Sequence, residues 1–196
     1  MGVSDMRASF DKLISWTGIL LAGLLLVTGG VLLYTASYIN GEVEKQLAIQ
    51  DITMPQGPAL ESLPEEDRKA LEPYAGSPMD TGPEARAYAD HYILAHLNKA
   101  SGGKTYEEVS GAYLKMTPEQ KASPEGQAAA QLRQTMFMGN TLRGLLLFGA
   151  AFATMGTIAG YAAIGAFVAA VILLVLGVLG LRHASRLEKA GAGNQL

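Results

Sequence analysis

The segment SGGKTYEE, residues 101–108, ends with part of a nucleotide-binding signature. Gly103, Lys104 and Thr105 match the Gly-Lys-Thr that closes a Walker loop, whose backbone N–H groups surround phosphates. The glycine required five residues before Gly103 is replaced by Asn98, and the preceding residues are typical of a helix rather than a buried strand. We therefore expect no nucleotide to bind here, and we expect nucleic acid to be no partner.

The same segment is better explained as a connection between two helices. Gly102 and Gly103 are suited to end one helix, because glycine tolerates the left-handed conformation. Thr105 then precedes Glu108 by three residues, which is the spacing of a capping box. The pattern predicts a helix end, a short turn and a helix start.

Histidines and carboxylates in the middle of the chain are not arranged as a catalytic or metal site. His91 and His96 are five residues apart, which places them about 140° apart on a helix. Two helical histidines that share a metal are usually four apart. Glu65, Glu66 and Asp67 fall in a predicted first turn, where acids interact favourably with the helix dipole. We expect no enzymatic activity, metal site or cofactor, and the chain has no cysteine to supply a thiolate.

Tyr88, Tyr92 and His96 recur at four-residue steps, with Ile93 and Leu97 beside them. A stripe of this kind usually packs against a neighbouring helix or a membrane surface. A ligand-binding role for the stripe is the alternative, but nothing else in the sequence supports it.

The elements that carry these residues separate into apolar and polar segments. No charged residue occurs in residues 13–41 or 144–181, and uncharged apolar runs of 18 or more residues are typical of membrane-spanning helices. We predict an all-α integral membrane protein with two transmembrane helices, a small helical extracytoplasmic domain and an extended second helix. The predicted segments are a tail at 1–12, a span at 13–39, the domain at 40–143, a long apolar helix at 144–181 and a tail at 182–196.

Aromatic residues mark the predicted membrane interfaces. Trp16 and Tyr34 are 18 residues apart, about 27 Å of helix, and aromatic residues are enriched at both ends of spans. Tyr161 is the corresponding interfacial residue for a second span at about 161–181. A cleaved signal peptide is the alternative for the first span, but its apolar run is longer than the usual 7–15 residues.

The charges of the tails predict the orientation. Arg7 and Lys12 precede the first span, and Arg182, Arg186 and Lys189 follow the second. Under the positive-inside rule, we expect both termini to be cytoplasmic. The central segment has 10 Lys and Arg against 15 Asp and Glu, a net charge of −5, and is placed outside.

Turn residues divide the central segment into short helices. Pro55, Pro58 and Pro64 predict an extended crossing over DITMPQGPALESLP, followed by a helix in LPEEDRKALEPYAG. SPMDTGP is a predicted loop. The remaining predicted helices are PEARAYADHYILAHLNKA, TYEEVSGAYLKM and TPEQKA.

The second apolar run is longer than one membrane crossing requires. Its 38 residues form about 57 Å of helix. With Ser123 as N-cap, we predict one continuous helix from about Pro124 to Leu187. Its part before Tyr161 must be covered by the chain's own helices or by another protein, unless Gly156, Gly160 and Gly165 break it into a re-entrant turn.

We predict that this part of the helix docks a partner. Leu145, Phe148 and Phe152 supply the apolar contacts, and Gly156 and Gly160 form a G-x-x-x-G face that allows helices to approach closely. Each of these residues can equally serve the chain's own packing. Neither predicted span contains an ionisable residue, so a channel or pump is not expected.

The segments YADHYILAHLNKASGGKTYEEVS and TLRGLLLFGAAFATMGTIAGYAAIGAFVAAVILLVLGVLGL resemble a family of small actinobacterial two-span membrane proteins. The resemblance covers roughly residues 13–186. It implies an accessory subunit of a membrane assembly in the bacterial plasma membrane, with the cytochrome bc–cytochrome oxidase supercomplex as its partner. Membrane lipids are the other partners that we expect. We therefore expect a non-catalytic accessory subunit. The alternative is an extracytoplasmic ligand-binding or sensing protein.

Overall fold

The computed structural model describes residues 3–193, with the side chains of residues 6–187 and of Lys189. The expected all-helical class is confirmed, since no strand occurs in that range and only Thr53 and Pro78 form an isolated β-bridge. The α-helices are α1 (Val3–Ala48), α2 (Pro58–Glu61), α3 (Glu65–Leu71), α4 (Gly82–Ala87), α5 (Leu94–Ser101), α6 (Tyr106–Leu114), α7 (Pro118–Ala122) and α8 (Pro124–Gly193). A 3₁₀ turn, η1 (Glu72–Tyr74), and a π-helical segment, η2 (Tyr88–Ile93), complete the chain.

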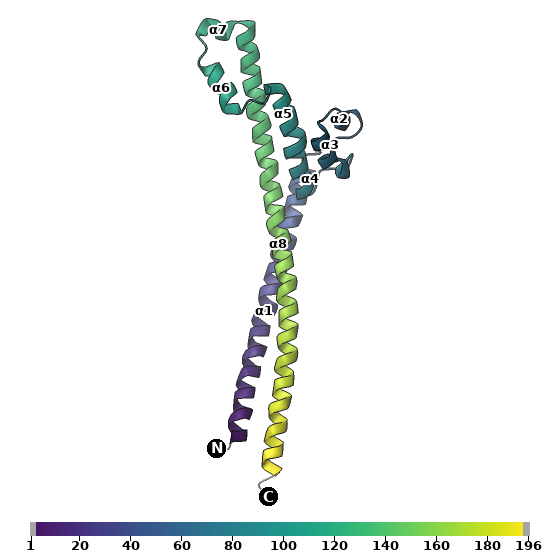
Figure 1. Cartoon of the computed structure of the whole chain (residues 1–196), viewed down its shortest axis with the longest axis vertical. Coiled ribbons are helices and arrows are strands. Elements are labelled where there is room, and N and C mark those ends of the chain that lie inside the picture. The colour runs from purple at the N-terminus through teal and green to yellow at the C-terminus, as the bar shows by residue number, and fades with distance from the viewer. Residues whose placement is uncertain (1–2, 194–196) are drawn as a thin grey trace. The chain divides into compact units, whose positions relative to one another are not determined.

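The two long helices, α1 and α8, contribute to two compact units (Figure 1). The two-helix unit comprises Met1–Tyr38 and Gly156–Leu196. The central unit comprises Ile39–Met155 and contains the short helices. Each unit has its own packing and is described separately.

Small residues hold the two-helix unit together. Ala22, Ala163 and Ala170 are completely buried. A Cβ added at Gly29 would lie 3.1 Å from the Phe167 ring, so this glycine admits a bulky neighbour. Such small side chains let two helices approach closely, as in membrane helix pairs.

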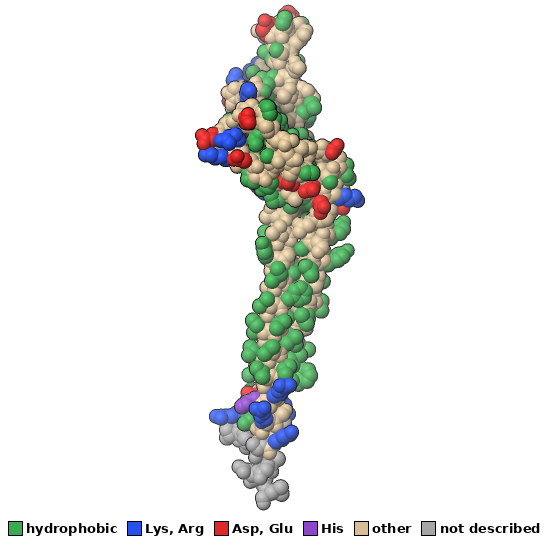
Figure 2. Space-filling view, turned by 90° about the vertical axis from the view of Figure 1, so that its right-hand side faces the viewer, with side chains coloured by type: hydrophobic (Ala, Val, Ile, Leu, Met, Phe, Trp, Pro, Cys, Tyr) green, Lys and Arg blue, Asp and Glu red, His purple; other side chains and the backbone are tan. Residues whose placement is uncertain are grey.

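The contacts of the two-helix unit fix an antiparallel register. Gly180 meets Ser15, and Gly160 meets Ala36. Between these two levels many large apolar side chains are exposed, and Figure 2 shows a band of hydrophobic side chains above a cluster of basic ones. Both α1 and α8 are long and apolar enough to cross a membrane.

The central unit begins with an irregular segment after α1. Met54 N donates to Ser77 O at 2.9 Å, and Met79 N donates to Ile52 O at 2.8 Å. The predicted extended crossing was wrong at one point, because α2 forms a helical turn within it. Pro58 stands at the start of that turn, where a missing N–H costs nothing.

The helix predicted for PEARAYADHYILAHLNKA is present without a gap, but it is not α-helical throughout. It is built from α4, the wider turns of η2, and α5. Thr81 begins α4 through a capping box with Glu84, so the last residues of the predicted loop SPMDTGP already belong to the helix start. Tyr88 and Tyr92 both lie in the π turns, and such segments are frequent at functional sites.

Other local predictions are confirmed. Gly102 is left-handed at the end of α5, with φ 65° and ψ 35°, and Thr105 and Glu108 form the predicted capping box. Ser123 Oγ accepts from Gly126 N at 3.2 Å at the start of α8. The helix then continues to Gly193 without a break, so the re-entrant alternative is wrong.

Candidate docking face and adjoining groove

The part of α8 that lies in the central unit has one covered side. Met136, Leu146 and Ala150 are buried there. A Cβ at Gly139 would lie 2.5 Å from the Leu97 side chain, and α4 begins with Gly82 packed directly on Ala153. The chain's own short helices therefore cover one side of α8, which is one of the two kinds of cover that the sequence predicted.

The other side of the same segment has no cover within the described chain. We call Leu145, Phe148, Phe152 and Met155 the docking face. Their exposed fractions are 63%, 67%, 54% and 57%. Their spacing of three, four and three residues is that of a helix–helix seam. Four large apolar side chains in one row exceed the scattered exposure that is normal on a surface.

The level of the docking face is set by its contact with α1. A Cβ at Gly149 would lie 3.8 Å from the Leu47 side chain. The two helices are antiparallel, so a step backward along α1 corresponds to a step forward along α8. Glu44 lies three residues before Leu47, and it is therefore level with Phe152, which lies three residues after Gly149. Glu44 is exposed, and a carboxylate is costly in hydrocarbon. Lipid chains are thus a poor cover for this face.

The predicted docking residues fall into two groups. Leu145, Phe148 and Phe152 belong to the exposed docking face. Gly156 is buried, and a Cβ at Gly160 would lie 3.8 Å from the Ala36 methyl, so the pairing of the chain's own helices uses the two glycines.

The predicted interface aromatics all point outward. Trp16 is 56% exposed, and Tyr34 and Tyr161 are each 72% exposed. Tyr34 also stacks on Tyr38, with ring centroids 6.5 Å apart. The contact between Gly160 and Ala36 brings Tyr161 to the level of this tyrosine pair, which sequence spacing could not establish.

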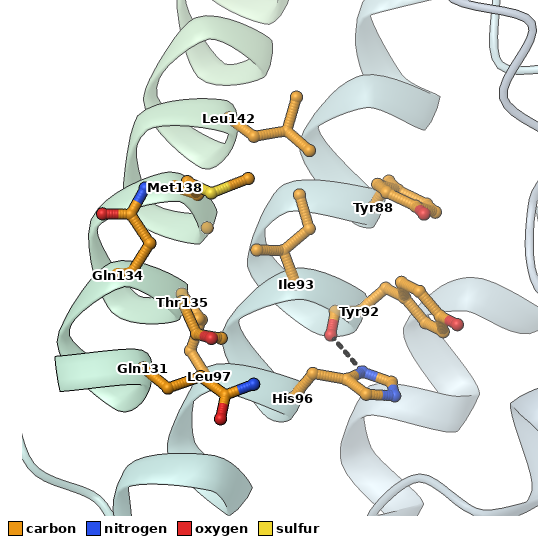
Figure 3. A pocket seen from close by; sticks show the side chains of 11 residues that line it. Tyr88, Tyr92, Ile93, His96, Leu97, Gln131, Gln134, Thr135, Met138 and Leu142 are labelled. Atoms are coloured by element: carbon orange, nitrogen blue, oxygen red, sulfur yellow. Dashed lines mark hydrogen bonds between the residues drawn. The ribbon is translucent and has the colours of Figure 1, made fainter. Parts of the chain in front are cut away.

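A groove lies beside the docking face, between α8 and the helix formed by η2 and α5 (Figure 3). Its volume is about 600 Å³. Tyr88, Tyr92 and His96 line up along one side of η2 and α5, whereas Met138 and Leu142 of α8 approach Ile93 (Figure 3). The remaining lining residues are Leu97, Gln131, Gln134, Thr135 and Gly139.

The aromatic stripe is internally ordered. The Tyr88 and Tyr92 ring centroids are 4.9 Å apart, and those of Tyr92 and His96 are 4.4 Å apart. His96 Nδ1 donates to the Tyr92 carbonyl at 2.8 Å, so Nε2 is the nitrogen left for another partner. Burial, reinforced by the nearby Tyr92 hydroxyl, raises the pKa of Tyr88, which keeps it a neutral phenol. The groove can therefore offer stacking surface and uncharged hydrogen-bonding groups.

The charged residues near the groove pair with one another over long sequence distances. Arg143 donates to Asp90 at 2.7 Å, and His91 Nδ1 lies 2.9 Å from Asp67. These pairs attach α8 and α3 to η2. Neither pair was predicted from the sequence, because no local pattern links residues 53 or 24 positions apart.

Comparisons with protein-family models, with curated proteins and with solved structures found no match to this chain.

Proposed function

We propose that the chain is a two-span membrane protein and a non-catalytic accessory subunit, which binds an apolar helix of another membrane subunit through its docking face. The membrane part of the proposal is supported by the length of the apolar band. Trp16 and Tyr34 on α1 are 18 residues apart, about 27 Å. On α8, Gly180 is nearly level with Trp16, and Tyr161 is nearly level with Tyr34. Both helices therefore cross about the same thickness.

The orientation proposed has both termini in the cytoplasm and the central unit outside. Basic residues at one end of the two-helix unit support it, since Arg7 and Lys12 lie at the same end as Arg182 and Arg186. The central segment, with its net charge of −5, is then outside the membrane.

The observation that carries the docking proposal is the level of the docking face. Its side chains are apolar and exposed, yet Phe152 is level with the Glu44 carboxylate. An exposed apolar surface of this kind marks an interaction site. A partner helix that extends above the membrane, as α8 itself does, fits this row of side chains.

The resemblance to small actinobacterial two-span proteins indicates which partner to test. We propose the cytochrome bc–cytochrome oxidase assembly. Affinity purification of the full chain from native membranes in mild detergent, with mass spectrometry and a haem absorption spectrum, tests this. Oxidase subunits at near-stoichiometric yield are expected, and an eluate without cytochrome bands would contradict the respiratory assignment.

Site-specific photo-crosslinking tests the docking face itself. A benzophenone amino acid replaces Phe148 in one variant and Phe152 in another, and both should crosslink to the same partner. Leu114 on α6, which is 60% exposed, is the matched control and should give no such product. Equal crosslinking from all three positions would contradict a specific face.

A second candidate function, ligand binding by the central unit, is favoured by the groove. Met138→Trp fills it, while Phe137→Trp alters a neighbouring residue that is similarly exposed but does not line it. Mass spectrometry of small molecules released from purified protein should then show a compound that the Met138 variant lacks and the Phe137 variant retains. Identical extracts from both variants would count against this function.

A further inference from the structure

A different surface, on the two-helix unit, combines charge with an apolar stripe. Arg182, Arg186 and Lys189 of α8, with Leu181 and Ser185, line a shallow concavity of about 290 Å³. Ala184 is completely buried. Arg182 and Arg186 each stand two residues from it, about 200° around the helix. The basic side chains therefore face away from α1, toward whatever surrounds the unit.

An apolar stripe leads along α8 to this basic cluster. Ile164, Val168, Val171, Val175 and Val178 follow one another at steps of four and three residues, and Arg182 comes four residues later. Their exposed fractions lie between 43% and 59%. Val168 to Val178 is ten residues, about 15 Å, which is half of the ~30 Å hydrocarbon core and so matches one leaflet.

We propose that this surface binds one anionic phospholipid, with the phosphate at Arg182, Arg186 and Lys189 and an acyl chain along Val168–Val178. Charge complementarity favours this occupant, because residues 182–196 hold three Lys and Arg against one Glu. Arginine binds phosphate oxygens in a bidentate manner. The Ser185 hydroxyl already donates to Leu181 O at 3.0 Å, so the guanidinium and ammonium groups supply the recognition.

The inference rests on the membrane location proposed for the chain but is independent of the partner subunit. Basic residues at a membrane surface attract anionic lipid by about 1 kcal/mol each, or about fivefold in affinity. Neutralising all three should therefore abolish the preference for an anionic headgroup. Arg7, a basic tail residue on α1, should contribute much less to the preference for an anionic headgroup.

Native mass spectrometry of the full chain in detergent can test this preference. Phosphatidylglycerol and phosphatidylcholine with identical acyl chains are titrated separately, and the phosphatidylglycerol adduct should form at least fivefold more readily. Arg182→Gln/Arg186→Gln/Lys189→Gln should equalise the two lipids, while Arg7→Gln should retain the preference. Circular dichroism should show that all variants keep their helix content.

Three outcomes would overturn the inference. These are equal binding of the two lipids by the native chain, a preference that survives the triple substitution, and displacement of the lipid by inorganic phosphate at equal concentration, since the last would make the acyl chain irrelevant. Failure of the membrane location is recognised separately, because alkaline carbonate would then extract the chain from membranes without detergent. Loss of the partner subunit would leave every lipid result unchanged.

Discussion

The two parts of α8 expose similar apolar side chains for different reasons. In the two-helix unit, Val168, Val171 and Val175 are about half exposed, and no ionisable residue interrupts the band. In the central unit, Phe148 and Phe152 are similarly exposed, and Phe152 is level with Glu44 on α1. The exposure of an apolar helix therefore does not identify its environment, and the neighbouring helix does.

This difference separates two kinds of surface on a single helix. Hydrocarbon can cover the valine stripe without any specific geometry, because lipid chains adapt to its shape. In the proposed function, the docking face binds a partner that tolerates a carboxylate at the same level, which lipid chains do not. Substitutions in one part of α8 should therefore leave the other part unaffected.

The largest effect is expected from an acid placed in the valine stripe. Val171→Asp should disfavour membrane insertion of α8 by about 3 kcal/mol, the cost of a carboxylate at the centre of a span. Phe152→Asp should leave insertion unchanged and should weaken only partner binding. A glycosylation-mapping insertion assay measures the first property for both variants. An equal loss of insertion would mean that both parts lie in the membrane.

On the side of α8 opposite the docking face, the packing of α4 can be disrupted by replacing Gly82 with a larger residue. A leucine at this position would collide with Ala153, and the nearby Ala150 backbone limits relaxation. Gly82→Leu should destabilise the central unit by about 2–3 kcal/mol. Thermal unfolding monitored by limited proteolysis should show the loss.

The control for that experiment is Gly111→Leu, since a Cβ at Gly111 meets open space. Residues 13–41 and 144–181 contain no Lys or Arg for trypsin to cleave at, so the two-helix unit should persist in both variants. A central unit that tolerates leucine at Gly82 would show that α4 does not pack on α8 as described.

A smaller loss of stability, confined to the central unit, should appear at acidic pH. Burial alone would raise the pKa of Glu84, but hydrogen bonds from Thr81, Ser77 and Asp80 together lower it below 4.5. A lowered folded-state pKa contributes stability that is present above about pH 4.5 and lost as the pH falls through the folded value. The central unit should therefore weaken below pH 4.5.

Urea unfolding at pH 7 and at pH 3.5 would measure this. Glu84→Gln should unfold more easily than the native chain at pH 7, and the difference should shrink at pH 3.5. Glu66→Gln changes an exposed acid in the first turn of α3 and should show no comparable shift. A difference that is the same at both pH values would show that the carboxylate charge is not what stabilises the cap of α4.

Local features were predicted well because each depends on a few neighbouring residues. Gly102 and Thr105 mark their helix ends correctly, since a left-handed glycine and a capping box are short-range interactions. The π turns of η2 were not predicted. They adjust a helix that is attached at Asp90 to Arg143 and at His91 to Asp67, and neither constraint is visible within a short window.

The sequence by itself determined the helical class, the two uncharged runs and the helix caps. It also determined that the apolar run of α8 is longer than one membrane crossing requires. These follow from composition and from residues within one or two helical turns. Only the tertiary structure decided which side of this additional apolar helix is covered, because α4 and α5, which cover it, are distant in the chain. It also decided that Phe152 is level with Glu44, because depth depends on how two antiparallel helices pair, and small residues such as Gly149 permit that pairing.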